Sequence, residues 1–344
     1  MAVSVSSASV SSSATATLAR VAIAGATGYA GQELVKLLAR HPHVTLTAAM
    51  SSGATSTPRP MPALARIWDE PVRPLDIDEL ARTADIVCLA LPEAASAEVG
   101  TALVERGLRV IDLSGAFRIR DDAQRKRWYP ATPSLPAGTV YGLPERDAAA
   151  IAGARLVSCP GCYPTAALLS LAPLEAAGLI NGPVVIDAKS GISGAGKTPS
   201  DRTHFCENHG SVAAYGIFSH RHTAEIEQEL QRDVTFVPHL VPLDRGILET
   251  IYVPVTPGTT EADVARVLTA AYAHSGFVRL TGGTLPEIKQ VAYTNFCDIG
   301  WKVDDARPRA VLVAVLDNLL KGAAGQAVQN LNLMLGLDER TGMR

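Results

Sequence analysis

The sequence predicts an α/β fold with two domains, and three observations support this prediction. In the first half, short apolar runs alternate with segments whose apolar residues recur at helical spacing, which is the pattern of parallel βαβ units. In the second half strands outnumber helices, which favours an α+β domain. The chain has 344 residues, of which 47% are hydrophobic, and a chain of this length forms two domains more often than one.

Charge, hydropathy and cysteine content exclude several classes of protein. The formal net charge is −3, so neither nucleic acid nor an anionic membrane is expected as the main partner. No apolar stretch reaches the ~20 residues of a membrane-spanning helix. The five cysteines leave one over in any full pairing, which in a long chain favours reduced thiols over a disulfide framework. We therefore expect a cytoplasmic protein that binds a small molecule.

Residues 1–18 predict a disordered tail that precedes the fold. The segment is rich in serine, alanine, threonine and valine and contains no charged residue, a composition typical of low-complexity chain. Organelle transit peptides are also rich in serine, but they are rich in arginine as well, and here the first arginine is Arg20. The sequence does not reveal whether the tail is processed.

The first strand–turn–helix unit predicts a dinucleotide-binding site. Residues 20–24 are an apolar run, the loop 25–31 has glycines three apart, and residues 32–38 show helical spacing. This is a variant of the dinucleotide fingerprint, in which glycines let the backbone approach a pyrophosphate at a helix N-terminus. A plain tight turn is the alternative. The cofactor contacts predicted here are Gly25, Thr27, Gly28, Tyr29 and Ala30.

The end of the second strand favours NADP over NAD. A strand is predicted over residues 44–50, and the chain then continues with Ser51 and Ser52 and small residues up to Ser56. An NAD-binding fold usually has a carboxylate here for the ribose 2′-hydroxyl. This sequence has hydroxyls instead, which can bind a 2′-phosphate. A simple turn of small residues is the alternative.

The third and fourth strands extend the same edge of the sheet. The third strand is predicted over 85–92, and its last residues, Leu91 and Pro92, lie at the edge where cofactors bind. After a helix over 94–105, a strand over 109–114 opens into a polar, proline-rich loop that runs to Glu145. Arg118 in this loop is a candidate clamp for a phosphate or carboxylate, with a surface salt bridge as the alternative.

The stretch 157–166 is the candidate catalytic centre. An apolar run ends in Cys159-Pro160-Gly161-Cys162, and an apolar helical pattern starts at Ala166. Cys162 is therefore expected close to a helix N-terminus, where free amide hydrogens and the helix dipole favour an anion. A thiol in that position loses its proton more easily, and the thiolate is the nucleophile.

A second glycine-rich loop, residues 190–198, follows a strand predicted over 183–189. By residue type and spacing alone, Gly191 to Thr198 matches the G-x-x-x-x-G-K-T pattern of a P-loop. A P-loop opens a helix, whereas the residues that follow, 199–216, are irregular and polar, so we interpret the match as false. The loop is expected to place backbone amides and hydroxyls beside the nicotinamide or the substrate, with Ser193 and Gly194 at the cofactor and Ser190 at the substrate.

His220 and His222 are the candidate proton-transfer residues. Thr223 is a plausible N-cap for a helix that follows, and in extended chain the two histidines would share one face. A metal site is not expected, because no cysteine or carboxylate stands at ligand spacing. A neutral imidazole titrates near the working pH, so one of the two is predicted as the general acid/base for Cys162.

The remaining residues predict the strand-rich second domain and a final helix. Asn318, at the glycine-rich start of that helix, is a further candidate cofactor contact. Strands are predicted over 234–238, 246–253, 291–298 and 310–315, with a helix near 262–274 and the final helix over 317–330.

Together these motifs resemble the N-acetyl-γ-glutamyl-phosphate reductases, a family of arginine biosynthesis. The most specific block is Pro160 to Thr165, which resembles the family's active-site signature. Blocks 25–31, 190–196, 220–222 and 317–330 follow the family in the same order.

The resemblance implies a fold and a division of the chain. The family belongs with the semialdehyde dehydrogenases, so it implies a Rossmann-type NADP-binding domain plus an α+β catalytic and dimerisation domain. The implied division is a tail over 1–18, an NADP-binding domain over 19–160 together with 319–344, and a catalytic domain over 161–318. The cofactor implied is NADP, and the assembly is a homodimer or homotetramer.

The resemblance also implies a mechanism. Cys162 attacks the acyl phosphate and expels phosphate, and the thioester is reduced to an aldehyde with a proton handled by His220 or His222. Arg118, Arg221 and Ser190 are the implied substrate contacts. Cys159 receives no role.

Two alternatives remain open from the sequence. The first is the same chemistry on another acyl phosphate, such as the aminoadipyl analogue or aspartyl phosphate, because one methylene is a small change in a pocket. The second is a non-catalytic dinucleotide-binding regulator in which Cys162 is inert.

Overall fold

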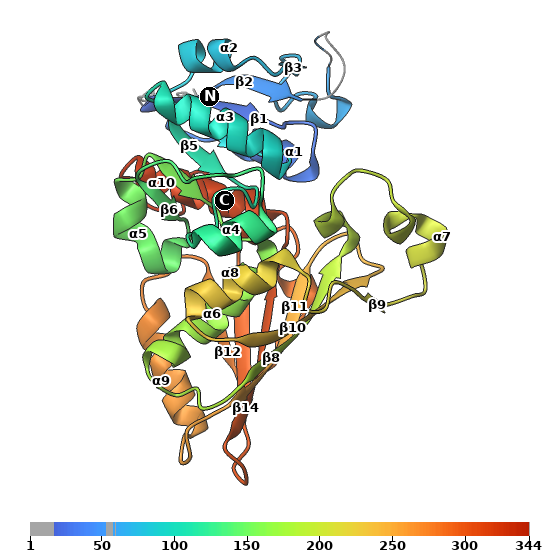
Figure 1. Cartoon of the computed structure of the whole chain (residues 1–344), viewed down its shortest axis with the longest axis vertical. Helices are drawn as coiled ribbons and strands as arrows, with labels where there is room; N and C mark the ends of the chain where they lie inside the picture. The colour runs from blue at the N-terminus through green and yellow to red at the C-terminus, as the bar shows by residue number, and fades with distance from the viewer. Residues whose placement is uncertain (1–16, 53–57, 59, 344) are drawn as a thin grey trace, which may run out of the picture.

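Two seven-stranded sheets form the framework of the described chain, and they follow one another along the long axis of the molecule (Figure 1). The computed structural model describes residues 17–343 except 53–57 and 59. Most of the predicted tail, residues 1–16, therefore lies outside the described residues. No helix in the described part is long and apolar enough to cross a bilayer.

The first sheet is parallel throughout, as the βαβ pattern predicts. Its spatial order is β3-β2-β1-β4-β5-β7-β6. The chain order reverses between β1 and β4, which is the topological switch point where α/β proteins bind ligands. The strands are β1 (Ala19–Ala24), β2 (Val44–Ser51), β3 (Arg73–Pro74), β4 (Ile86–Leu89), β5 (Arg109–Asp112), β6 (Thr139–Tyr141) and β7 (Leu156–Ser158).

Helices cover both faces of this sheet, which explains its continuous apolar strands. One core lies between the sheet and α1 and α10, and a second lies on the face covered by α3. The last helix of the chain thus packs on the first sheet. The helices are α1 (Tyr29–Leu38), α2 (Ile77–Thr83), α3 (Glu93–Glu105), α4 (Asp122–Trp128), α5 (Pro144–Ala152) and α10 (Gly325–Met334).

The second sheet is mixed, with the order β12-β13-β14-β11-β8-β10-β9. Helices α6 (Cys162–Ala176), α8 (Arg221–Leu230) and α9 (Glu261–Tyr272) cover one face and form the largest core. Residues on the other face of β8, β10 and β11 are half-buried or, at Tyr252, exposed, and they alternate with core residues except at the end of β8. The strands are β8 (Val184–Gly191), β9 (Ala213–Ala214), β10 (Val234–Val241), β11 (Ile247–Pro254), β12 (Val278–Gly282), β13 (Cys297–Val303) and β14 (Arg309–Leu316).

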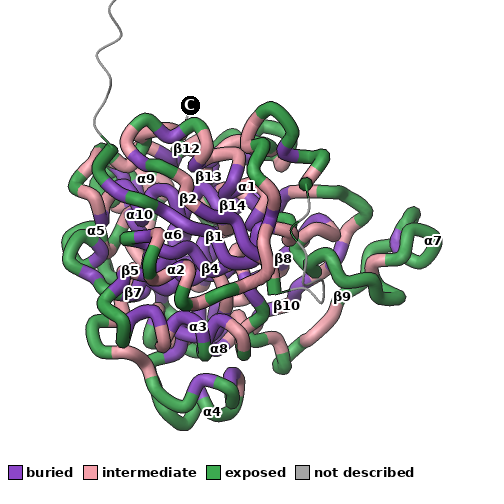
Figure 2. Tube along the Cα trace, turned by 90° about the horizontal axis from the view of Figure 1, so that it is seen from above, coloured by how far each residue is buried: buried purple, intermediate pink, exposed green. Residues whose placement is uncertain are grey.

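Four sequence predictions about local structure were wrong. The loop predicted down to Glu145 contains α4 and β6, because their short segments lack a clear apolar period. The strand predicted over 291–298 starts only at Cys297, and β12 was missed. The final helix starts later than predicted, because a π-helical turn (Leu320–Ala324) precedes α10. The segment 199–216, predicted as irregular, contains α7 (Phe205–Asn208), which stands clear of the body (Figures 1 and 2).

The core of the second sheet contains a carboxyl group, that of Glu249 on β11. Glu249 on β11 is fully buried, and neither carboxylate oxygen has a hydrogen-bond partner. Its cross-strand neighbours are Ala188 and Ala314, whose small side chains leave room for it. Burial raises the pKa of Glu249 well above its ordinary value, because no nearby cation compensates for the lost hydration. Burial without a partner therefore favours the neutral form of this carboxyl group in the folded protein.

Glu249→Gln is expected to stabilise the fold more at pH 8 than at pH 5. The unfolded chain ionises this carboxyl freely above its ordinary pKa, whereas the folded protein holds the proton, so wild-type stability falls as pH rises through that range. The size of the extra gain at pH 8 reports how far the pKa of Glu249 is raised in the folded protein. Urea unfolding at both pH values measures it, with exposed Glu70→Gln as the control. An equal effect at both pH values would contradict a neutral Glu249.

Candidate active site

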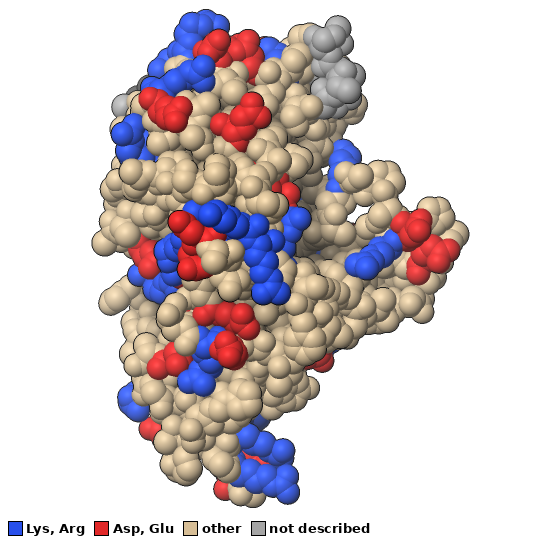
Figure 3. Space-filling view, in the orientation of Figure 1, with Lys and Arg blue, Asp and Glu red and all other residues tan. Residues whose placement is uncertain are grey.

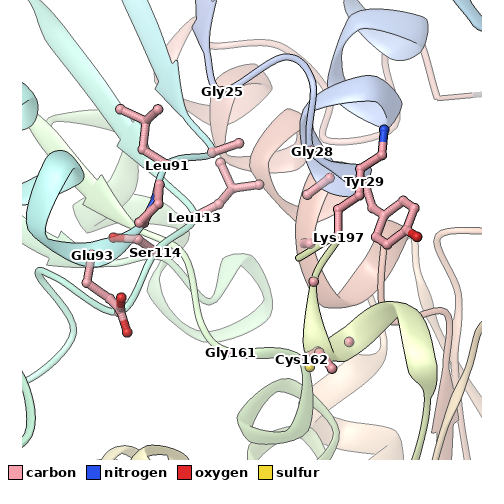
Figure 4. A pocket seen from close by; sticks show the side chains of 18 of the residues that line it. Gly25, Gly28, Tyr29, Leu91, Glu93, Leu113, Ser114, Gly161, Cys162 and Lys197 are labelled. Carbon is pink, nitrogen blue, oxygen red and sulfur yellow. The ribbon is translucent and has the colours of Figure 1, made fainter. Parts of the chain in front are cut away.

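A cleft of about 860 Å³ lies between the two sheets, at the carboxyl ends of the strands next to the switch point (Figure 4). It brings together residues from the dinucleotide loop, the cysteine block, the second glycine loop and the histidine motif. The predicted site residues that line it are Gly25, Thr27, Gly28, Tyr29, Ala30, Ser51, Ser52, Leu91, Pro92, Arg118, Cys162, Ser193, Gly194, His220, Arg221, His222 and Asn318. Ser190 does not line it, because it is buried and its hydroxyl donates to the Gly191 carbonyl.

The glycines of the loop 25–31 have separate roles that suit a dinucleotide. Gly25 has φ +97°, and a Cβ there would lie 2.2 Å from the Ala90 carbonyl oxygen, so only glycine can make this turn. A Cβ at Gly31 would lie 2.1 Å from the Gly25 oxygen, so this glycine lets α1 pack on the loop. At Gly28 a Cβ would meet only the Gly25 oxygen, at 3.6 Å. The space in front of Gly28 is therefore open to a ligand.

The first turn of α1 is ready to bind an anion. Gly28 is the N-cap residue, and no side chain caps the helix. The first amide groups of α1 therefore have no side-chain acceptor at the edge of the cleft. Together with the open space at Gly28, this arrangement fits the pyrophosphate of a dinucleotide.

The end of β2 presents hydroxyl groups to the same cleft. The Thr27 and Ser51 hydroxyl oxygens lie 3.0 Å apart, and Ser52 also lines the cleft. Among the described residues that line the cleft, the one carboxylate is Glu93, at the start of α3. Residues 53–56, which entered the prediction of NADP, lie outside the described residues.

Cys162 is the first residue of α6, as predicted, but its thiol is not acidic. The N-cap Gly161 offers no side-chain acceptor, so the amides at the helix start face the cleft floor. Loss of water around the half-buried sulfur raises the pKa of Cys162 to about 11, although Arg118 and the Tyr163 amide act in the opposite direction. Burial therefore opposes the thiolate that the helix start was predicted to favour. The thiol needs a base.

His220 caps α8, which corrects the predicted N-cap at Thr223. The His220 Nδ1 accepts a hydrogen bond of 3.1 Å from the His222 amide. The helix therefore begins at Arg221, and the two histidines do not lie in extended chain. Its imidazole contacts the rings of Tyr163, Tyr215 and Phe236. Burial among these rings lowers the pKa of His220 to about 4, so its imidazole is neutral near pH 7.

His222 lies against the peptide that precedes Cys162. A Cβ on Gly161 would lie 2.4 Å from His222 Nε2, so glycine is required there for the imidazole to fit. Arg118 Nη1 lies 3.4 Å from the same nitrogen. Burial, the His220 ring and Arg118 lower the pKa of His222 well below its ordinary value. Protonation of His222 is thus opposed by a fixed positive charge.

Glu225 organises the site, and the sequence analysis missed it. It is fully buried on α8, and it accepts hydrogen bonds from the Tyr141 hydroxyl at 2.7 Å and the Gly161 amide at 2.8 Å. Arg118 lies 3.3 Å from its other oxygen. Glu225 thereby fixes the turn that positions Cys162. Glu225 lies one helical turn after His222, so the sequence could have placed both side chains on the same face of the helix. A glutamate in a charged helix, however, suggests a surface residue.

The two predicted arginines differ in environment. Arg118 is buried and also donates to the carbonyls of Leu113 and Cys159, which fixes its guanidinium at the cleft floor. Arg221 is exposed, forms an ion pair with Glu93 on the opposite wall, and lies 5.3 Å from the ring centre of Tyr129. A ligand anion could exchange with Glu93 at Arg221 without unfolding the site.

A polar cluster supports the cleft from behind. Asn318 donates to the Ser193 hydroxyl at 2.9 Å and accepts from the Gly246 amide at 2.7 Å, which ties the second glycine loop to the start of the π-helical turn. In that turn, a Cβ on Gly322 would lie 2.7 Å from Cys162 Cβ. The next residue back, Lys321, is fully buried and lies 2.6 Å from Glu145. Sequence reasoning missed this ion pair.

Comparison with known proteins agrees with this geometry. The family model described as "Semialdehyde dehydrogenase, NAD binding domain" matches residues 20–154, and "Semialdehyde dehydrogenase, dimerisation domain" matches residues 162–318. Among solved structures, aspartate semialdehyde dehydrogenase II from Vibrio cholerae aligns with a TM-score of 0.70 over 92% of this chain and 98% of that chain, at 19% identity. The predicted Rossmann-type domain with an α+β partner domain is confirmed.

Curated relatives give a finer match. The chain is 44% identical over 339 residues to the N-acetyl-gamma-glutamyl-phosphate reductase of Brevibacillus brevis, covering 95% of this chain and 98% of that protein. It is 47% identical over 337 residues to the enzyme of the same name from Halorhodospira halophila, covering 94% and 97%. This chain therefore belongs to the N-acetyl-gamma-glutamyl-phosphate reductase family of the semialdehyde dehydrogenases.

Proposed function

We propose that the cleft reduces N-acetyl-γ-glutamyl phosphate to N-acetyl-L-glutamate 5-semialdehyde, with release of phosphate, through a thioester on Cys162. This is the third step of arginine biosynthesis from glutamate. The observation that supports it most is the position of Cys162 at the start of α6, in one cleft with a dinucleotide loop and two neutral imidazoles.

The cofactor is NADP, and residues of both walls would hold it. The amides at the start of α1 would take its pyrophosphate, while Ser51 and Ser52 would take the 2′-phosphate. Ser193 and Gly194, from the loop 190–198, also line the cleft. When bound, NADPH supplies the hydride that reduces the thioester carbonyl.

The acyl transfer uses the Cys162 sulfur, an imidazole and a backbone amide of this chain. The Cys162 sulfur forms a bond to the γ-carbonyl carbon, the bond from that carbon to the phosphate oxygen breaks, and phosphate leaves with its electron pair. The thiol proton passes to a neutral imidazole of the cleft, which is possible because both histidines are deprotonated near pH 7. The amide at the start of α6 would stabilise the oxyanion. Splitting one displacement into two steps lowers each barrier.

We assign the proton at the thiohemiacetal oxygen to His220. In the α8 cap its Nδ1 accepts the His222 amide hydrogen, so its neutral form carries the proton on Nε2, which can donate a hydrogen bond to that oxygen. His222 is less suited, because Arg118 at 3.4 Å opposes its protonation. As the carbonyl forms again, the carbon–sulfur bond breaks, the aldehyde leaves, and the Cys162 thiolate recovers a proton from the imidazole that took the thiol proton.

His220→Asn is expected to lower kcat by about 10²–10⁴-fold, the usual contribution of a general acid. Asparagine is a good N-cap residue, so α8 should stay intact. Since the His220 pKa is about 4, the wild-type kcat/KM should not show a loss from this group until pH approaches that value. His209→Asn, at an exposed position, is the matched control. If His220→Asn turned over at close to the wild-type rate, His222 would be the proton-transfer residue instead.

Arg118 and Arg221 are the proposed contacts for the substrate's anionic groups, since both guanidinium groups line the cleft near Cys162. Ser190 could contribute only through its neighbours, because its hydroxyl is buried. The substrate identity is tested by following NADPH oxidation with N-acetyl-γ-glutamyl, aminoadipyl and aspartyl phosphates in turn. A clear preference for one of the other two would overturn the assignment, and inertness of Cys162 to thiol reagents with all three would favour a regulator.

Copies of the chain associate, as the description of its second domain indicates. We propose a homodimer or homotetramer that uses the half-buried face of β8, β10 and β11. Both signs of charge are interspersed over the face of the molecule in Figure 3, which suits a small-molecule enzyme better than a nucleic-acid-binding protein. Light scattering of the purified protein distinguishes dimer from tetramer.

A further inference from the structure

The loop that imitates a P-loop in sequence carries a lysine that reaches the dinucleotide loop. Residues Ile192–Ala195 form a 3₁₀ turn, and Gly196 follows with φ +84°, a conformation that turns the chain sharply. The Lys197 ammonium then donates to the Thr27 carbonyl oxygen at 3.3 Å, across 170 residues of sequence. It also lies 5.9 Å from the ring centre of Tyr29, within cation–π range. Figure 4 shows Lys197 beside Tyr29 and Gly28.

Lys197 is the cation of the cleft whose charge is not neutralised. The described residues that line the cleft include three cations, Lys197, Arg118 and Arg221. Arg118 is paired with Glu225, and Arg221 with Glu93. Lys197 forms no ion pair with a described carboxylate, and one carbonyl oxygen satisfies one of its three N–H donors. An ammonium group in this state, next to an uncapped helix start, attracts a phosphate.

We propose that Lys197 reaches from the loop 190–198 to the start of α1 and binds the pyrophosphate of NADP there, an assignment that rests on the proposed dinucleotide binding. The amides of α1 and the ammonium would hold the pyrophosphate between them, near the open space at Gly28. Bound cofactor would thereby add a second link between the loops 190–198 and 25–31, beside the hydrogen bond from Lys197 to Thr27. Because Ser193 of the same loop is bonded to Asn318, this bridge also orders the wall beside Cys162.

The test is cofactor affinity without substrate, measured by titration calorimetry on the full chain. Lys197→Met is expected to weaken NADPH and NADH binding by similar factors of about 10- to 100-fold, the range for a hydrogen bond to a charged group. Lys197→Arg should retain most of the affinity, and the salt dependence of binding should be weaker in Lys197→Met. Lys126→Met, which removes an exposed charge on α4, is the matched control.

Three results would contradict the assignment of Lys197 to the pyrophosphate. If Lys197→Met lost affinity for NADPH but not for NADH, Lys197 would contact the 2′-phosphate. If its affinity for both cofactors were unchanged, Lys197 would have no role in cofactor binding. Unchanged thermal unfolding of ligand-free Lys197→Met is expected, and a lower midpoint would reveal a structural role instead. If the wild-type chain bound neither NADPH nor NADH, the proposed function itself would fail, a result distinct from wild-type binding with an indifferent Lys197→Met.

Discussion

Cys162→Ser is expected to lower kcat for acyl-phosphate reduction by on the order of 10⁴- to 10⁶-fold, the scale of loss when members of a catalytic nucleophile–base unit are removed. A serine hydroxyl is far less acidic than a thiol, and in this buried position nothing replaces the sulfur as leaving group in the last step. NADPH binding should be unchanged, because the dinucleotide loop 25–31 and Cys162 are separate segments of the cleft lining. Single-turnover NADPH oxidation and NADPH titration measure the two effects separately.

Cys159→Ser is the matched control. Cys159 is three residues earlier in the chain, is buried, and lies 3.4 Å from the Asn330 side chain, which donates to its sulfur. A serine hydroxyl can accept the same hydrogen bond, so we expect turnover close to wild type. Turnover of Cys162→Ser close to wild type, or an equal loss in both variants, would exclude a thioester on Cys162.

Lys321→Met is expected to lower the free energy of unfolding by about 3–5 kcal/mol, the cost of breaking a buried ion pair by removing one partner. Lys321 and Glu145 are both buried, with exposed fractions of 0% and 1%. The ammonium also donates to Gln329 at 2.7 Å, and Gln329 in turn donates to Glu145. The variant would leave the Glu145 carboxylate without its cation inside the protein. Urea unfolding measures the loss.

Two further variants test this explanation. Lys302→Met breaks the exposed pair with Glu261 and should cost at most about 1 kcal/mol. The double variant Lys321→Met with Glu145→Leu should regain part of the stability, because no unpaired charge remains buried. If Lys321→Met cost no more than Lys302→Met, the buried pair would have no special weight. Because the π-helical turn of Lys321 packs on Cys162 through Gly322, a loss of order there should also reduce turnover.

Local chemistry explains the predictions that were confirmed. A parallel strand, a glycine turn and a helix follow from apolar spacing and from a backbone conformation that Gly25 alone can adopt, so β1, the loop and α1 were readable from consecutive residues. The helix start at Cys162 follows in the same way from the Pro-Gly turn and the apolar run after it. The fold class and the family rest on such segments. The division of the chain at residues 160 and 319 stays a proposal.

The predictions that failed depended on contacts between distant segments. His220 rather than Thr223 caps α8, because the ring folds back on the His222 amide between Tyr163 and Phe236. Short elements such as α4 and β6 have too few residues for a clear period and are held by their neighbours. Glu225 and Lys321 are charged residues in otherwise ordinary helical patterns, and no local signal shows that either is buried.

By itself the sequence determined the first strand, its glycine turn and helix, and the helix start at Cys162, since these depend on backbone conformation and on side-chain chemistry within a few residues; the role of Cys162 as the nucleophile stays a proposal. Only the tertiary structure decided the ionisation of the cleft. Burial raises the pKa of the Cys162 thiol and lowers the pKa of both imidazoles, and Lys197 reaches Thr27, because desolvation and charge pairing act between groups that the chain separates by tens to hundreds of residues.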